Sequence, residues 1–197
     1  MLKKLNKLVG LKKSEFDEYV NLGEIHLSEA RLIPTYKIGD ELALTSIFLS
    51  TLKLVKEFKN NIFSELKLPR GGKVFYYTEA SFKNIDSNSR IDGLVLVVVS
   101  GVIKDAVFFE MKNKNNQLEQ EQILKYIELA KKLRVTKVVT VSNQFVADSS
   151  QSPLSIRVPK SISLSHFSWT YIKTVGQLLL FNNETNIEDE DQVLIMK

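Results

Sequence analysis

Three charged side chains stand at the ends of two apolar stretches of the sequence. Asp92 is near the start of IDGLVLVVV, and Glu110 and Lys112 are at the end of AVFFEMK. Because side chains alternate across a strand, Glu110 and Lys112 project from one face and Met111 from the other. Antiparallel pairing brings the start of one strand beside the end of the next, so Asp92 can lie beside Glu110. The sequence therefore predicts two carboxylates and one ammonium group at a single sheet edge.

These residue types suit the hydrolysis of a phosphodiester. Carboxylate oxygens are the ligands that Mg²⁺ prefers, and a bound Mg²⁺ acidifies water and neutralises charge on the phosphate. An ammonium group beside the cation stabilises the charge that develops in the transition state. The same residues also suit a plain salt bridge at a strand end, in which Lys112 pairs with Glu110. The three residues alone leave both interpretations open.

A fourth carboxylate lies in the clearest predicted helix, which spans residues 40–63. Apolar residues recur there every three or four positions, the spacing of a helix with one buried face. Glu41 lies on or next to that apolar stripe, where an unpaired carboxylate is costly. A carboxylate at this position therefore needs a reason.

Strand and helix patterns alternate along the rest of the chain. Runs rich in valine, isoleucine and aromatic residues predict strands over 74–77, 91–99, 106–112 and 137–141. A turn that begins at Ser100-Gly101 and ends near Asp105 joins the second and third of these into a hairpin. A helix is predicted over 115–134, and the later segments read as β-type at 156–158 and 164–169 and as a helix over 169–180. We therefore predict an α/β (mixed α+β) protein with a central mixed β-sheet flanked by helices.

The order of these elements and residues resembles the PD-(D/E)XK nuclease superfamily, which has the restriction-endonuclease-like fold. The family motif places an Asp on a hairpin strand and ends the next strand with Glu/Asp-x-Lys. Here the motif reads Arg90-Ile-Asp92-Gly93, followed by Phe109-Glu110-Met111-Lys112. The resemblance covers residues 40–141. The proline of the family name is absent, because Ile91 precedes the aspartate.

Two further matches extend the resemblance. In one branch of the family a helix after the motif carries Gln-x-x-x-Tyr, which matches Gln122 and Tyr126, one helical turn apart on one face. Many members carry a Glu on the helix before the core, and Glu41 occupies that place. Without the resemblance, Gln122 and Tyr126 read as an ordinary solvated glutamine and a half-buried helix tyrosine.

The resemblance implies a restriction-endonuclease-like core and a Mg²⁺-dependent deoxyribonuclease, in which Mn²⁺ substitutes for Mg²⁺. The catalytic residues it implies are Asp92, Glu110, Lys112, Glu41, Gln122 and Tyr126. The metal ligands it implies are Asp92, Glu110 and the backbone carbonyl of Met111, with Glu41 binding through water or holding a second cation. Lys112 then stabilises the developing charge or orients the attacking water, and the Gln-x-x-x-Tyr pair positions a water or a phosphate at the rim.

Phage defence by restriction and DNA repair both use this fold, and the resemblance leaves both open. It also leaves open a catalytically silent module on the same fold, which binds nucleic acid or another protein. A protein partner or a homodimer is compatible with either interpretation. The sequence does not distinguish DNA from RNA, single from double strands, or one base sequence from another.

Composition favours a polyanionic partner and excludes several other chemistries. The 197 residues carry a net charge of +4, and residues 182–197 hold five acidic side chains against one lysine, so the rest of the chain is more basic still. A basic surface suits DNA phosphates, although solvated lysine faces are the ordinary alternative. The absence of cysteine excludes disulfides, thiolate zinc sites and cysteine nucleophiles, and two histidines exclude a histidine-rich metal centre.

We divide the chain into an N-terminal helical extension over 1–38, the nuclease-like domain over 39–181, and an acidic segment over 182–197 that reads as the start of a further region. Apolar residues at helical spacing predict short helices over 2–9 and 14–27. The longest apolar run has six residues, too short to span a bilayer, so we expect a cytoplasmic protein without membrane contact. His166 and Trp169 are predicted to pack in the fold rather than to bind a ligand.

Overall fold

The computed structural model describes residues 5–31, 40–69, 71–113, 116–181, 187 and 189–196. Its centre is a six-stranded sheet in which the strands lie side by side in chain order. The strands are β1 (Ile25–Glu29), β2 (Lys73–Phe82), β3 (Asp86–Val99), β4 (Val102–Met111), β5 (Lys137–Ser142) and β6 (Ser163–Ser168). The pairs from β1 to β4 are antiparallel, and β4, β5 and β6 run parallel. The prediction of a mixed α/β protein with a mixed sheet is confirmed.

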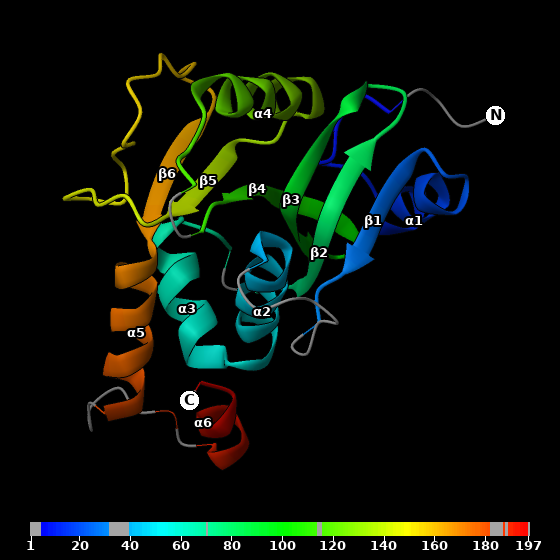
Figure 1. Ribbon diagram of the computed structural model, residues 1–197. Coiled ribbons are helices and arrows are strands. Elements are labelled where there is room, and N and C mark those ends of the chain that lie inside the picture. Colours follow the sequence, from blue (N-terminus) through cyan, green and yellow to red (C-terminus); the bar gives the residue numbers. More distant parts are fainter. Residues whose placement is uncertain are drawn as a thin grey trace.

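Helices cover both faces of the sheet (Figure 1). They are α1 (Lys13–Asn21), α2 (Glu41–Leu54), α3 (Lys56–Glu65), α4 (Gln120–Leu133), α5 (Trp169–Phe181) and α6 (Glu190–Met196). One core forms where α1 and α4 pack on the sheet, and a second forms beneath α2, α3 and α5. The central strand β3 contributes Leu94 and Leu96 to the first core and Val95 and Val97 to the second. Burial on both faces explains why its sequence is almost continuously apolar.

The predicted hairpin is present, but its turn is shorter than the expected 100–105, and β4 begins at Val102 rather than at residue 106. Ser100 and Gly101 both have positive φ, 51° and 76°, which is the conformation that closes a two-residue hairpin loop. The turn pairs Val99 with Val102 and sets β3 against β4. The two strands that carry the charged residues are therefore joined directly and held in one register.

An extra residue in β4 shifts that register near the turn. Val98 pairs with Ile103, but Val97 pairs with Asp105, so Lys104 is a β-bulge between the two pairs. All pairs farther from the turn are displaced by one residue relative to a regular hairpin.

Several boundaries differ from the sequence-based expectations. The helix predicted over 40–63 is two helices, because Val55 is buried in an extended conformation (φ −107°, ψ 105°) between α2 and α3. The apolar periodicity runs through this break, since both helices face the same side of the sheet. Strand β2 is longer than the predicted 74–77, and β3 begins before residue 91.

The N-terminal expectations were partly wrong. The helix predicted over 14–27 ends at Asn21, and Gly23 adopts positive φ (70°) in the turn that leads into β1. Residues 5–9 are not helical, but Leu5 and Leu8 are buried in the core beside α4. Residue 2 lies outside the described residues.

The later segments also differ. Residues 156–158 form no strand, and the predicted helix over 115–134 begins at Gln120, with residue 115 outside the described part. The predicted helix over 169–180 is α5, and the apolar stretch at the end of the chain forms the short helix α6.

Replacing Gly93 by alanine is expected to lower the free energy of unfolding by about 1–3 kcal/mol, the usual cost of overpacking. An added methyl group would lie 3.0 Å from Cβ of Phe109 and 3.2 Å from Cδ1 of Leu49, which belongs to α2. The melting temperature should fall by about 2–4 °C per kcal/mol. Gly71→Ala is the control, because nothing lies within 4 Å of its added methyl. Equal melting curves for the two variants would contradict this close approach of α2 to β3.

Candidate active site

The shifted register places Asp92 beside Glu110. Gly93 pairs with Phe109, so the next two residues toward the strand ends are Asp92 and Glu110, on the same face. Oδ2 of Asp92 accepts a hydrogen bond from the backbone N–H of Met111 at 3.0 Å. The N–H and C=O of one strand residue point to the same side, so the Met111 carbonyl also faces Asp92. The Met111 side chain points into the opposite core, as predicted.

Lys112 lies between two carboxylates. Its Nζ is 2.9 Å from Oε1 of Glu110 and 3.9 Å from Oε2 of Glu41. Glu110 is completely buried, and neither of its carboxylate oxygens has a hydrogen bond of good geometry within the described structure. The contact with Lys112 is therefore an ion pair, and Asp92 and Tyr126 also lie close enough to affect the Glu110 carboxyl.

Burial and mutual repulsion shift the titration of the two central carboxyls. Burial, together with the charge of Asp92, raises the pKa of Glu110 to about 7, although Tyr126 and Lys112 partly offset the shift. Burial also raises the pKa of Asp92, against the hydrogen bond from Met111. Burial alone would lower the pKa of Lys112, but its contact with Glu110 outweighs that effect and the pKa is raised. At neutral pH the site thus holds a protonated lysine beside a Glu110 carboxyl whose pKa lies near that pH.

Glu41 is hydrogen-bonded to the segment that follows β4. It is in the first turn of α2, and its Oε1 accepts hydrogen bonds from the backbone N–H of Asn113 at 3.1 Å and from the side-chain amide of Asn116 at 2.7 Å. These bonds tie α2 to the segment that follows β4. Glu41 therefore lies at the edge of the site, near Lys112 but already engaged with the chain.

Tyr126 and Gln122 come from α4 and both line a hollow of about 240 Å³ beside Arg90. The Tyr126 hydroxyl accepts the backbone N–H of Asp92 and donates to the carbonyl of Arg90, both at 3.0 Å. Its side chain is buried, and it holds the backbone of β3 at Asp92. Gln122 is half-exposed in the same hollow.

One residue beside the site was not predicted to be there. The indole Nε1–H of Trp169 donates to the backbone carbonyl of Lys112 at 2.7 Å. The two residues are 57 positions apart, and no sequence pattern links them. His166 is buried with its ring nitrogens 2.8 Å from the Thr140 hydroxyl and the Gln144 carbonyl, which confirms that it packs in the fold.

The oxygen atoms of the site fit a small hard cation. Within the described ranges, no group of three or more His, Cys, Asp or Glu side chains is arranged to hold a metal ion. The donors that could do so are therefore the two carboxylates Asp92 and Glu110 with the Met111 carbonyl. The buried Glu110 oxygens, which lack well-formed hydrogen bonds, are the observation that fits a cation here. Oxygen donors of this kind match Mg²⁺ or Mn²⁺.

Comparisons of the chain with protein-family models, curated proteins and solved structures found no match. Among the described helices, none is long and apolar enough to cross a membrane. Arguments about function therefore rest on the geometry of Asp92, Glu110 and Lys112.

The raised pKa of Glu110 predicts that, without divalent metal, stability falls as the pH rises from about 4.5 to about 7. In that window the folded protein keeps a proton that the unfolded chain has lost, so stability is greatest below the window and declines through it. Glu110→Gln should remove this decline, a difference on the order of 1–3 kcal/mol at pH 8.

Urea unfolding of both proteins in EDTA across this pH range measures the difference. Glu128→Gln, at an exposed position of α4, is the control and should keep the decline of the parent. A parent that gains stability from pH 4.5 to 7 relative to Glu110→Gln would contradict the prediction.

Proposed function

We propose that this protein is a metal-dependent endonuclease that hydrolyses phosphodiester bonds of DNA, built on a core like that of the restriction endonucleases. The observation that carries the proposal is the buried Glu110 carboxylate. It lies beside Asp92 and against Lys112, with both of its oxygens short of hydrogen bonds. A structural ion pair does not need a second, mutually repelling carboxylate at its buried end. A cation site does.

The proposed cofactor is Mg²⁺, for which Mn²⁺ substitutes. Asp92, Glu110 and the Met111 carbonyl would hold it, and Glu41 is near enough to Lys112 to influence the same site. When bound, such a cation neutralises charge on a phosphate and lowers the pKa of a water molecule. The hydrogen bond from Met111 to Asp92 already fixes one carboxylate in place, which reduces the reorganisation that binding requires.

The chain's own residues have distinct tasks in this proposal. The Lys112 ammonium group, whose pKa is raised, stays protonated and stabilises negative charge on the phosphate in the transition state. Glu110 orients that ammonium group at 2.9 Å. Tyr126 holds the Asp92 backbone, and Gln122 at the rim contacts a water or an adjacent phosphate.

The substrate class follows from charge. A chain with a net charge of +4 attracts a polyanion, and lysines that neutralise phosphates release counterions. Acting on chromosomal or invading DNA, the enzyme would work in the cytoplasm, in restriction or in DNA repair. A silent DNA-binding module would need the lysines but not the buried carboxylate pair, which favours the enzyme.

Lys112→Ala is expected to reduce cleavage at least about 100-fold, because the ammonium group acts mainly on the transition state. Nicking of supercoiled plasmid with Mg²⁺ or Mn²⁺ measures cleavage, and gel shift in Ca²⁺ measures binding without chemistry. Binding should stay nearly intact, since affinity is spread over many lysines. Lys132→Ala, exposed at the far end of α4, is the control and should cleave normally. A folded Lys112→Ala protein that no longer binds DNA would contradict this role.

Mn²⁺ is expected to raise the melting temperature of the parent. A ligand of the folded state stabilises it by about 1.4 kcal/mol per tenfold excess over its Kd, and each kcal/mol is worth about 2–4 °C. Asp92→Asn removes a ligand and a repelling charge together. It should be as stable as the parent or more so in EDTA, yet lose most of the Mn²⁺ shift. Asp191→Asn, exposed on α6, should keep the whole shift.

A salt-bridged strand end predicts the opposite pattern. In that case the parent shows no response to Mn²⁺, and Asp92→Asn is less stable than the parent in EDTA. Melting curves thus separate the two interpretations without knowledge of the substrate.

A further inference from the structure

The main chain of Lys112 is held from two sides, just beyond the end of β4. Its N–H donates to the Val141 carbonyl of β5 at 2.8 Å. Its C=O accepts the indole N–H of Trp169 at 2.7 Å. The first bond continues the sheet, but the second comes from a side chain at the start of α5. Beyond Met111 the strand has ended, so these two bonds set where the Lys112 backbone lies.

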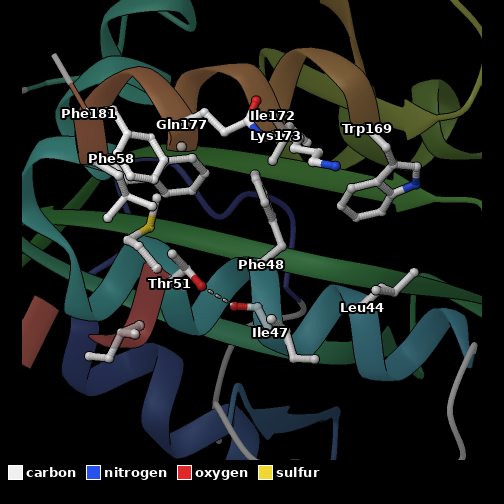
Figure 2. Close-up of a pocket in the computed structure, with 14 residues that line it drawn as sticks. Leu44, Ile47, Phe48, Thr51, Phe58, Trp169, Ile172, Lys173, Gln177 and Phe181 are labelled. Carbon is white, nitrogen blue, oxygen red and sulfur yellow. Dashed lines mark hydrogen bonds between the residues drawn. The ribbon is translucent and has the colours of Figure 1, made fainter. Parts of the chain in front are cut away.

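Trp169 is itself firmly placed. It follows β6 directly, and the Ser168 hydroxyl accepts the N–H of Tyr171 at 3.0 Å in the first turn of α5. The indole ring meets Phe48 of α2 edge to face, with the ring centres 6.5 Å apart. Figure 2 shows the ring at one end of an apolar groove, with its nitrogen on the edge away from Phe48. The ring thus packs between helices while its N–H reaches the site.

We propose that Trp169 is a positioning residue, whose indole N–H fixes the main chain of Lys112 and thereby places the ammonium group against Glu110. The bond acts at the backbone, one residue past the sheet, where a small displacement is carried directly to Nζ. A misplacement of about 1 Å in a reacting group can cost about 100-fold in rate. The catalytic consequence rests on the nuclease function proposed above, but the placement of Lys112 does not.

The competing explanation is that Trp169 only fills space in the core. That role needs the aromatic ring but not its N–H group. The chain contains a single tryptophan, so replacing tryptophan throughout the protein by an analogue changes this position only. 3-Benzothienylalanine keeps the size of the ring but has sulfur in place of the N–H. 5-Fluorotryptophan keeps the N–H and is the matched control.

The two labelled proteins are compared by amide hydrogen exchange, melting temperature and plasmid nicking. The benzothienyl protein should exchange the Lys112 amide about tenfold faster or more, while the amides of Val138 and Val139 in the middle of β5 exchange as in the control. Its kcat should fall about tenfold or more with KM unchanged, in the manner of a misplaced catalytic group. Its melting temperature should stay close to that of the control.

The outcomes test the positioning role of Trp169 separately from the proposed nuclease function. Equal protection of the Lys112 amide in the two proteins overturns the positioning role, whether or not the parent cleaves DNA. Faster exchange throughout the protein, with a lower melting temperature, also overturns it, because that is the signature of lost packing. A parent without nuclease activity overturns the nuclease function, and local loosening of Lys112 still supports the positioning role. If the benzothienyl protein does not fold, Trp169→Phe removes the same N–H and is measured in the same way.

Discussion

The β-bulge at Lys104 is the constraint on which the arrangement of the charged residues depends. Counted from the two-residue turn without a bulge, Asp92 would lie opposite Phe109, and Glu110 would point to the other face of the sheet. The extra residue moves the register by one and puts both carboxylates together. Asp105 stabilises this bulge, since its carboxylate accepts the N–H of the next residue and the Nζ of a β5 lysine at 2.6 Å. The placement of the two carboxylates at one end of the hairpin thus depends on a register shift near the other end, where this ion pair lies.

Asp92, Lys112 and the segment after Lys112 lie beyond the last β3–β4 pair, and a different helix holds the backbone at each of these places. Helix α4 holds Asp92 through the Tyr126 hydroxyl, and α5 holds Lys112 through the Trp169 indole. Helix α2 holds the following segment through Glu41. Strand ends fray when their last backbone groups lack partners. The three helix side chains supply those partners, and this explains how a site at a sheet edge stays ordered while Glu110 remains short of hydrogen bonds.

The sequence predicted those parts of the structure that rest on local periodicity. The valine-rich β3, the hairpin turn at Ser100-Gly101 and the shared face of Glu110 and Lys112 follow from alternation and turn chemistry. It did not predict the bulge, because β4 is buried on both faces beyond it and so shows no alternation in which a shift by one residue would be visible. The break at Val55 was hidden for a similar reason, since both helices bury the same side. The contact between Trp169 and the Lys112 carbonyl depends on tertiary packing, which hydrophobic periodicity does not report.

The bond between Trp169 and Lys112 also bears on the order in which the molecule is completed. It joins residues 57 positions apart, and the two strands between them, β5 and β6, pair parallel to each other and to β4, which requires long crossovers. Such non-local pairing forms slowly compared with a hairpin. During synthesis the β3–β4 hairpin emerges well before α5, so both carboxylates can meet while the lysine still lacks its last anchor. The anchoring of Lys112 is therefore expected to be among the last features of the fold to form, and an incomplete chain would carry Asp92, Glu110 and Lys112 without the indole that fixes the Lys112 backbone.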